Sequence, residues 1–234
     1  MEEKKPRAMK SRMNNWETAL AIGWLPVHVY LLPLLLIRVF PGISTMDLNV
    51  WDYAAGTVVL AVLCGRFLRR DFETLCERPG QVLRQVLVSY GLMILMNLLL
   101  NQALYAILPE ANPNTEAVMD MVDDEPGKSA AMAIFLAPIL EELIFRGGIF
   151  GLARRFSRVL AYCLSILLFA VYHVWSYGLM NPIYWLFILQ YLPITFLLCR
   201  CYEKTETIWT PIFLHMLVNA VSFAAENALR GLGA

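Results

Sequence analysis

The chain has 234 residues, of which 59% are hydrophobic and only 16% are charged, and its formal net charge is zero. Soluble domains carry roughly 25% charged residues, so this composition indicates a membrane protein. The balanced charge gives no general attraction to nucleic acid, and we expect no nucleic-acid partner. The sequence shows no internal repeat and no long soluble stretch, which indicates a single integral membrane domain over residues 1–234.

Stretches of about 20 apolar residues are long enough to cross a bilayer as helices. The sequence predicts a bundle of seven such transmembrane helices, of which the second is the shortest and the least apolar. They run over Thr18–Phe40, Asp52–Phe67, Val86–Leu108, Ser129–Phe150, Val159–Leu179, Ile183–Arg200 and Ile208–Leu229. The predicted fold class is therefore an all-α, polytopic membrane helix bundle.

An eighth, shorter helix is predicted over Leu68–Glu77, lying along the membrane interface. Its apolar residues recur at helical spacing and form one stripe, as in helices that lie in the plane of a membrane. The stripe consists of Leu68, Phe72, Leu75 and Cys76. Pro79 and Gly80 end this helix, because proline and glycine interrupt helical structure.

Positively charged residues are concentrated in alternate connections, which predicts the orientation of the bundle. They lie before the first span, around the second and third, and after the fourth and sixth spans. Cytoplasmic loops carry the excess of lysine and arginine, so we expect a cytoplasmic N-terminus and an external C-terminus. The external segment Pro109–Lys128 is acidic and contains proline, and we expect an irregular, mobile connection there.

Two adjacent glutamates, Glu141 and Glu142, interrupt the apolar run of the fourth span. A carboxylate near the bilayer centre costs at least about 3 kcal/mol, so such residues face a protein interior or a cavity and mark functional sites. Arg146 lies one turn beyond Glu142, which predicts an ion pair within the helix that supports the site. Glu141 points about 100° away from Glu142 around the helix axis, so it must have another partner.

Further polar residues lie in the later spans. His173 is deep in the fifth span, and His215 and Asn219 lie one turn apart on the same face of the seventh. The depths of these residues and Glu141 allow them to converge on one polar cavity in the middle to inner half of the bilayer. His28 in the first span is interpreted as a hydrogen-bonded packing residue, because a single intramembrane histidine often has that role.

These residues form three motifs in a fixed order. Glu141 to Arg146 fits E-E-x-x-x-R, Phe169 to His173 fits F-x-x-x-H, and His215 to Asn219 fits H-x-x-x-N. In that order they resemble the motifs of the CPBP family, the Abi-like group of CAAX proteases and bacteriocin-processing enzymes. The resemblance implies an intramembrane endopeptidase, with a motif-bearing core over residues 129–229.

The resemblance also implies roles for the residues. Glu141 acts as general base on a water molecule, His173 helps to hold or deprotonate that water, and His215 and Asn219 stabilise the oxyanion. Glu142, Arg146 and Phe169 support them. We therefore expect no cofactor. The alternative is a zinc protease with Glu141, His173 and His215 as ligands, although no H-E-x-x-H motif is present to favour it.

The expected substrate is a peptide or a membrane protein, with or without a lipid group, cleaved within the lipid bilayer. A compact chain with short cytoplasmic loops is typical of a multi-pass protein of a prokaryotic plasma membrane. A non-catalytic scaffold or bacteriocin-immunity protein of the same fold is the first alternative. A small transporter is the second, but the chain lacks the inverted repeat that many transporters contain.

Overall fold

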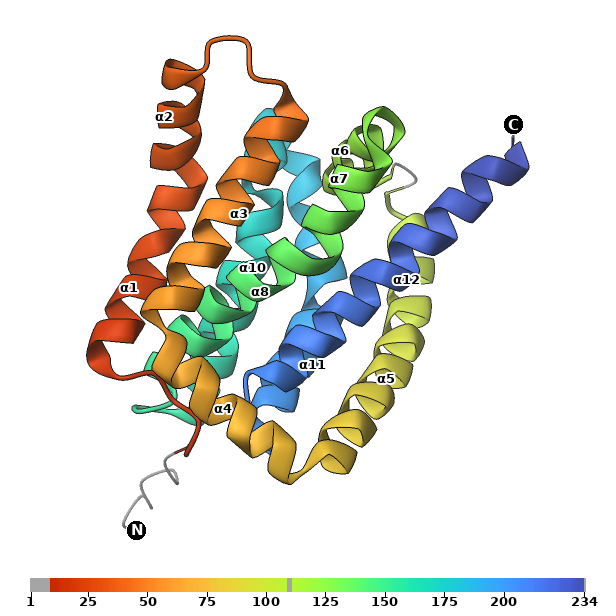
Figure 1. Ribbon diagram of the computed structural model, residues 1–234. Coiled ribbons are helices and arrows are strands. Elements are labelled where there is room, and N and C mark those ends of the chain that lie inside the picture. The colour runs from red at the N-terminus through yellow and green to blue at the C-terminus, as the bar shows by residue number, and fades with distance from the viewer. Residues whose placement is uncertain (1–8, 109–110, 234) are drawn as a thin grey trace.

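The computed structural model describes residues 9–108 and 111–233, and in these ranges every regular element is a helix. The long helices run up and down between the two ends of the bundle in Figure 1. The described N-terminal residues lie at the lower end, and the last helix ends at the upper right. This arrangement confirms the predicted all-α membrane bundle.

Four helical segments form the first part of the chain, up to Tyr105. The first is continuous over α1 (Asn15–Pro26), a π-helical stretch η1 (Val27–Leu31) and α2 (Leu32–Val39). Helix α3 (Thr45–Leu63) returns to the lower end, where α4 (Gly65–Glu77) leads into α5 (Pro79–Tyr105). Asn14 begins α1 with a capping box, in which its side chain accepts from the Glu17 backbone and Glu17 accepts from the Asn14 backbone.

The second half contains the three motifs. One helical segment comprises α7 (Pro126–Ala131), η2 (Met132–Leu136), α8 (Ala137–Glu142), η3 (Leu143–Phe150) and α9 (Gly151–Ala153), with η2 and η3 π-helical. It is followed by α10 (Arg158–Met180), a 3₁₀ turn η4 (Pro182–Phe187), α11 (Ile188–Thr205) and α12 (Trp209–Gly233). In Figure 1, α8 and α12 run diagonally across the bundle, and α10 and α11 lie behind them.

Five helical segments of the described chain are long and apolar enough to cross a membrane, by length and composition. They are Asn15–Val39, Thr45–Leu63, Pro79–Tyr105, Arg158–Met180 and Pro182–Thr205. The other two predicted spans correspond to residues 126–153 and to α12, which carry the charged and polar residues of the first and third motifs. The predicted spans thus correspond to helices, and their number in the membrane stays a prediction.

Helix α4 lies across the lower end of the bundle and contains the predicted interfacial helix Leu68–Glu77 (Figure 1). Asp71 is its main buried polar residue. The Asp71 carboxylate accepts a hydrogen bond from the Ile208 backbone (2.8 Å) and another from the Ser11 hydroxyl. Burial raises the pKa of Asp71 to about 6, although these hydrogen bonds act in the opposite direction. Asp71 thereby joins α4 to the segment before α1 and to the start of α12.

The prediction of an irregular connection over Pro109–Lys128 was wrong. Helix α6 (Pro113–Asp124) occupies most of it, while residues 109–110 lie outside the described part of the chain. The Asn112 side chain accepts from the Asn114 backbone, and Pro113 supplies a favourable first helical residue. Met119 and Val122, three residues apart, bury one side of the helix. The Asn112 cap, Pro113 and the buried apolar side stabilise a helix here, although the prediction took the acidic composition to favour an irregular segment.

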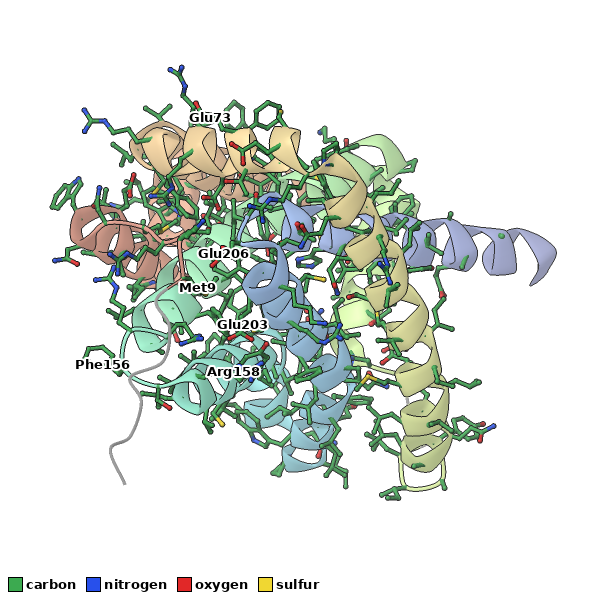
Figure 2. The ribbon with its side chains drawn as sticks, turned by 90° about the horizontal axis from the view of Figure 1, so that it is seen from below. Met9, Glu73, Phe156, Arg158, Glu203 and Glu206 are labelled. Atoms are coloured by element: carbon green, nitrogen blue, oxygen red, sulfur yellow. The ribbon has the colours of Figure 1, made fainter. Side chains whose placement is uncertain are left out.

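The lower end of the bundle gathers arginines of several elements. It contains a cavity of about 630 Å³ whose lining includes Arg12, Arg66, Arg70 and Arg155. Figure 2 shows this end from below, with Arg158 beside Glu203 and Phe156 at the edge. Arg158 pairs with the Glu203 carboxylate at 2.8 Å. The positive charge predicted for the cytoplasmic side is therefore collected at one end of the molecule, opposite α6.

Cysteine labelling tests the predicted orientation. In a variant lacking Cys64, Cys76, Cys163, Cys199 and Cys201, a single cysteine is placed at Phe156 or at Glu116, both of which are exposed. We expect Phe156→Cys to react with a membrane-impermeant thiol reagent only after the cells are opened. Glu116→Cys should react in intact cells, because α6 lies at the other end. The reverse pattern would contradict the predicted orientation.

Candidate active site

Glu142 and Arg146 form the predicted ion pair within one helical segment. Arg146 Nη1 donates to Glu142 Oε1 at 2.9 Å, and both side chains are completely buried. The Arg146 guanidinium also lies over the Phe169 ring of α10, 4.4 Å from its centroid, which adds a cation–π contact. Phe169 of the second motif thus packs directly on the arginine of the first.

The structure adds a partner for Glu142 that the sequence did not indicate. His215 Nδ1 of α12 lies 2.9 Å from Glu142 Oε1. Since Glu142 is already paired with Arg146, it is a carboxylate and can only accept, so His215 Nδ1 must carry the hydrogen. This bond fixes the ring orientation and directs Nε2 toward Glu141.

His173 is oriented in the same way by a different acceptor. Its Nδ1 lies 2.9 Å from the backbone carbonyl oxygen of Phe169, one turn earlier in α10. A carbonyl oxygen can only accept, so Nδ1 carries the hydrogen and Nε2 is the free nitrogen of the neutral ring. The ring packs between Phe169 and Tyr191, with centroids 4.4 and 4.7 Å away.

Glu141 lies where the two histidines meet. Its Oε2 atom is 3.8 Å from His173 Nε2 and 3.8 Å from His215 Nε2. Glu141 is buried, and Oε2 makes no hydrogen bond with any residue that the structure describes. The predicted convergence of α8, α10 and α12 is therefore present, although these separations exceed direct hydrogen bonds.

Asn219, the last motif residue, contacts the backbone of η2 rather than Glu141 or the histidines among the described contacts. Its Nδ2 donates to the Ala133 carbonyl oxygen at 2.8 Å. In a π-helix a carbonyl bonds to the amide five residues later, as the Met132 carbonyl of η2 does with the Ala137 amide. The next donor would be Pro138, which has no N–H, so the Ala133 carbonyl remains available. Asn219 uses one of its two amide hydrogens here and retains the other.

The spacing of Glu141, His173 and His215 differs from that of a zinc site. In tetrahedral coordination, oxygen and nitrogen ligands lie about 3.4 Å from one another, which is closer than Glu141 to either histidine. No group of three or more histidine, cysteine, aspartate or glutamate side chains in the described chain could hold a metal ion as arranged. Zinc binding by Glu141, His173 and His215 would require these side chains to approach.

Two site neighbours were missed by the sequence analysis. The Tyr53 hydroxyl of α3 lies 3.3 Å from Glu141 Oε1, and the Tyr172 hydroxyl of α10 lies 2.9 Å from that of Tyr53. Tyr172 directly precedes the motif histidine, but tyrosine is common in membrane helices and carries no distinctive signal. Tyr53 lies in a span that bears no motif.

Known proteins resemble the part of the chain that carries this buried glutamate and the two histidines. Residues 128–221 match the family model described as "Type II CAAX prenyl endopeptidase Rce1-like". The curated protein named "Putative membrane peptidase YdiL", from Bacillus subtilis (strain 168), is 33% identical over 107 residues, or 45% of this chain. The chain spans 40% of the length of that relative. No solved structure matches significantly.

The two matches confirm the resemblance to the CPBP and CAAX protease family over the motif-bearing part of the chain. The family match contains all the motif residues, from Glu141 to Asn219. The similarity is therefore to the motif-bearing part of the chain, and the five apolar helices are long enough to cross a membrane.

The buried ion pair gives a prediction about stability. Arg146→Ala and Glu142→Gln should each destabilise the protein by about 3–5 kcal/mol, because each leaves a buried charge without its partner. Thermal unfolding in detergent, followed by circular dichroism, measures the effect. Arg69→Ala is the matched control, since Arg69 and Glu73 are exposed and such a pair contributes at most about 1 kcal/mol. Unfolding of Arg146→Ala at the parent temperature would contradict the structural role of the pair.

Proposed function

We propose that this protein is an intramembrane endopeptidase that hydrolyses a peptide bond with a glutamate-activated water molecule. The observation that supports this most directly is the position of Glu141 Oε2, buried and 3.8 Å from the Nε2 atoms of both histidines. A carboxylate and a histidine at this spacing can hold one water molecule between them, because 3.8 Å is less than two hydrogen-bond lengths.

In the proposed reaction, the water donates its hydrogens to Glu141 Oε2 and to His173 Nε2. This arrangement leaves an oxygen lone pair free to attack the carbonyl carbon of the scissile peptide. As the carbon–oxygen bond forms, Glu141 accepts the proton of the water and later gives it to the leaving amine. The peptide bond then breaks, so the products are a carboxylic acid and an amine, and Glu141 is regenerated.

The oxyanion of the tetrahedral intermediate needs hydrogen-bond donors. The second amide hydrogen of Asn219 is one, because only the first is bound to Ala133. His215 Nε2 is the other in the form of the enzyme that has taken up one further proton from solvent before the attack and that keeps it through the reaction. The Glu142 carboxylate on its Nδ1 side stabilises that imidazolium, as a carboxylate does behind the histidine of a catalytic triad. In a buried site these donors are worth more than in water.

The proposed substrate is a peptide or a membrane protein, with or without a lipid group, that reaches Glu141 from the lower end of the bundle. That end is the cytoplasmic one if the predicted orientation in a prokaryotic plasma membrane is correct. The arginines around the cavity there would attract acidic substrate groups or the lipid surface.

Replacement of the base tests this function. We expect Glu141→Gln to lower cleavage of quenched fluorescent peptides by about 10²- to 10⁴-fold, the usual contribution of a general base, while the protein folds normally. Glu73→Gln is the control, because Glu73 is an exposed glutamate of α4. A well-folded Glu141→Gln variant that cleaves at the parent rate would exclude the proposed base. A parent protein that cleaves none of a broad peptide library would favour the non-catalytic scaffold.

Chelation tests the proposed independence from metal. Activity should survive prolonged treatment with a strong chelator, and elemental analysis should find much less than one metal ion per chain. His173→Ala and His215→Ala should then lose activity without any change in metal content. Zinc bound in a 1:1 ratio, and lost and restored together with activity, would instead establish Glu141, His173 and His215 as ligands.

A further inference from the structure

A continuous series of polar contacts leads away from Glu141 on the side opposite the histidines. It passes from Glu141 Oε1 to the Tyr53 hydroxyl (3.3 Å), and from there to the Tyr172 hydroxyl (2.9 Å). The Tyr172 hydroxyl contacts His28 Nε2 (2.7 Å), and His28 Nδ1 lies 2.6 Å from Asp52 Oδ2. The series connects α8, α3, α10 and η1, and we call its last four residues the Tyr53–Asp52 network.

The far end of this network carries an ionisable pair inside the bundle. His28 and Asp52 are both buried, and they come from η1 and α3, two elements that contain no motif. Buried charges inside a membrane are costly and are rarely kept without a function. Contact between the helices alone would not require an aspartate, because the two tyrosines and a neutral histidine can join them.

The direction of the hydrogen bonds follows from counting hydrogens. Each tyrosine hydroxyl has one hydrogen to donate, so the bonds must all point the same way along the series. If they point toward Glu141, Tyr53 donates to a Glu141 carboxylate and His28 carries hydrogens on both nitrogens. If they point away, Glu141 is protonated and His28 Nε2 accepts from Tyr172. The two arrangements contain the same number of hydrogens and the same net charge.

We propose that the Tyr53–Asp52 network positions Glu141 and holds it as the carboxylate that a general base requires. This inference rests on the proposed function, and it assigns Tyr53, Tyr172, His28 and Asp52 as positioning residues. Asp52 is decisive, because its negative charge stabilises the doubly protonated His28 and so selects the arrangement in which every bond points toward Glu141.

The network also provides a route by which Glu141 can lose a proton. The O–H bond of Glu141 breaks as one forms on Tyr53, the original Tyr53 hydrogen moves to Tyr172, and the Tyr172 hydrogen moves to His28 Nε2. One proton is thereby transferred from Glu141 to His28, and each tyrosine ends with one hydrogen, as before. Asp52 balances the new charge on His28, so no further reactant is needed.

Conservative variants separate this role from simple packing. Tyr53→Phe and Tyr172→Phe each remove one oxygen atom and break the network. We expect kcat to fall about 10- to 100-fold, in line with the cost of a mispositioned catalytic group, while KM changes less than about twofold. The kcat of the double variant should be no lower than that of the less active single variant, because the effects of substitutions within one network are not additive.

Tyr90→Phe is the matched control. Tyr90 is a half-buried tyrosine of α5, and its hydroxyl makes no hydrogen bond to a residue of the described chain. This variant should keep both kcat and KM. Yield and thermal unfolding are measured for all variants. Folded Tyr53→Phe and Tyr172→Phe proteins with the parent kcat would overturn the proposal, as would losses of activity that only follow losses of thermal stability.

Infrared spectroscopy tests the network without any substrate. In the parent protein Glu141 should contribute no band of a protonated carboxyl group. Asp52→Asn should produce such a band, and the additional change Glu141→Gln should remove it. If Asp52→Asn gives no band that depends on Glu141, the proposal is wrong. Because this measurement needs no cleavage, it distinguishes failure of the network from failure of the proposed protease activity.

Discussion

The Glu142 carboxylate is the group on which the rest of the site depends. It is completely buried, and a single oxygen, Oε1, lies within hydrogen-bond distance of both Arg146 and His215. The arginine compensates the cost of burying the charge, and the histidine uses that charge to fix its own ring. Because Glu142 comes from α8 and His215 from α12, the same carboxylate also holds together two helices far apart in the sequence. Glu141, its neighbour, takes no part in this pairing and faces the Nε2 atoms of the two histidines.

Irregular helix geometry recurs around this centre. The π-helical stretches η1, η2 and η3 carry His28, the carbonyl that binds Asn219, and Arg146. A π-helical turn adds a residue to the turn and disturbs the regular backbone pairing, and such turns are frequent at functional sites. Here Pro138 removes the amide that would satisfy Ala133, and a side chain from α12 replaces it. The departures from α-helical geometry therefore serve to connect the motif helices to one another.

The membrane explains why the polar groups are distributed as they are. The outer faces of the long helices expose large apolar side chains, such as Leu34, Leu99 and Leu167. Most charged and polar groups of the site face inward, and several of them contact a residue of another helix, as His215 does with Glu142 and Tyr53 with Tyr172. Two separate sets result, one around Glu142 and the other ending at Asp52, and Glu141 lies between them. In lipid neither set could be exposed without a large cost.

The sequence by itself determined most of the helices, their approximate limits and three residues that converge, Glu141, His173 and His215, because apolar length and intramembrane charge are local signals. It also predicted the Glu142–Arg146 pair, which depends only on helical spacing. It did not reveal that His215 shares Glu142, that Asn219 binds the backbone of η2, or that Tyr53, Tyr172, His28 and Asp52 form one network. Nor did it show that α6 is helical. Those features depend on which helix faces pack against one another. Packing between segments that are distant in the chain leaves no periodic signal in a single sequence.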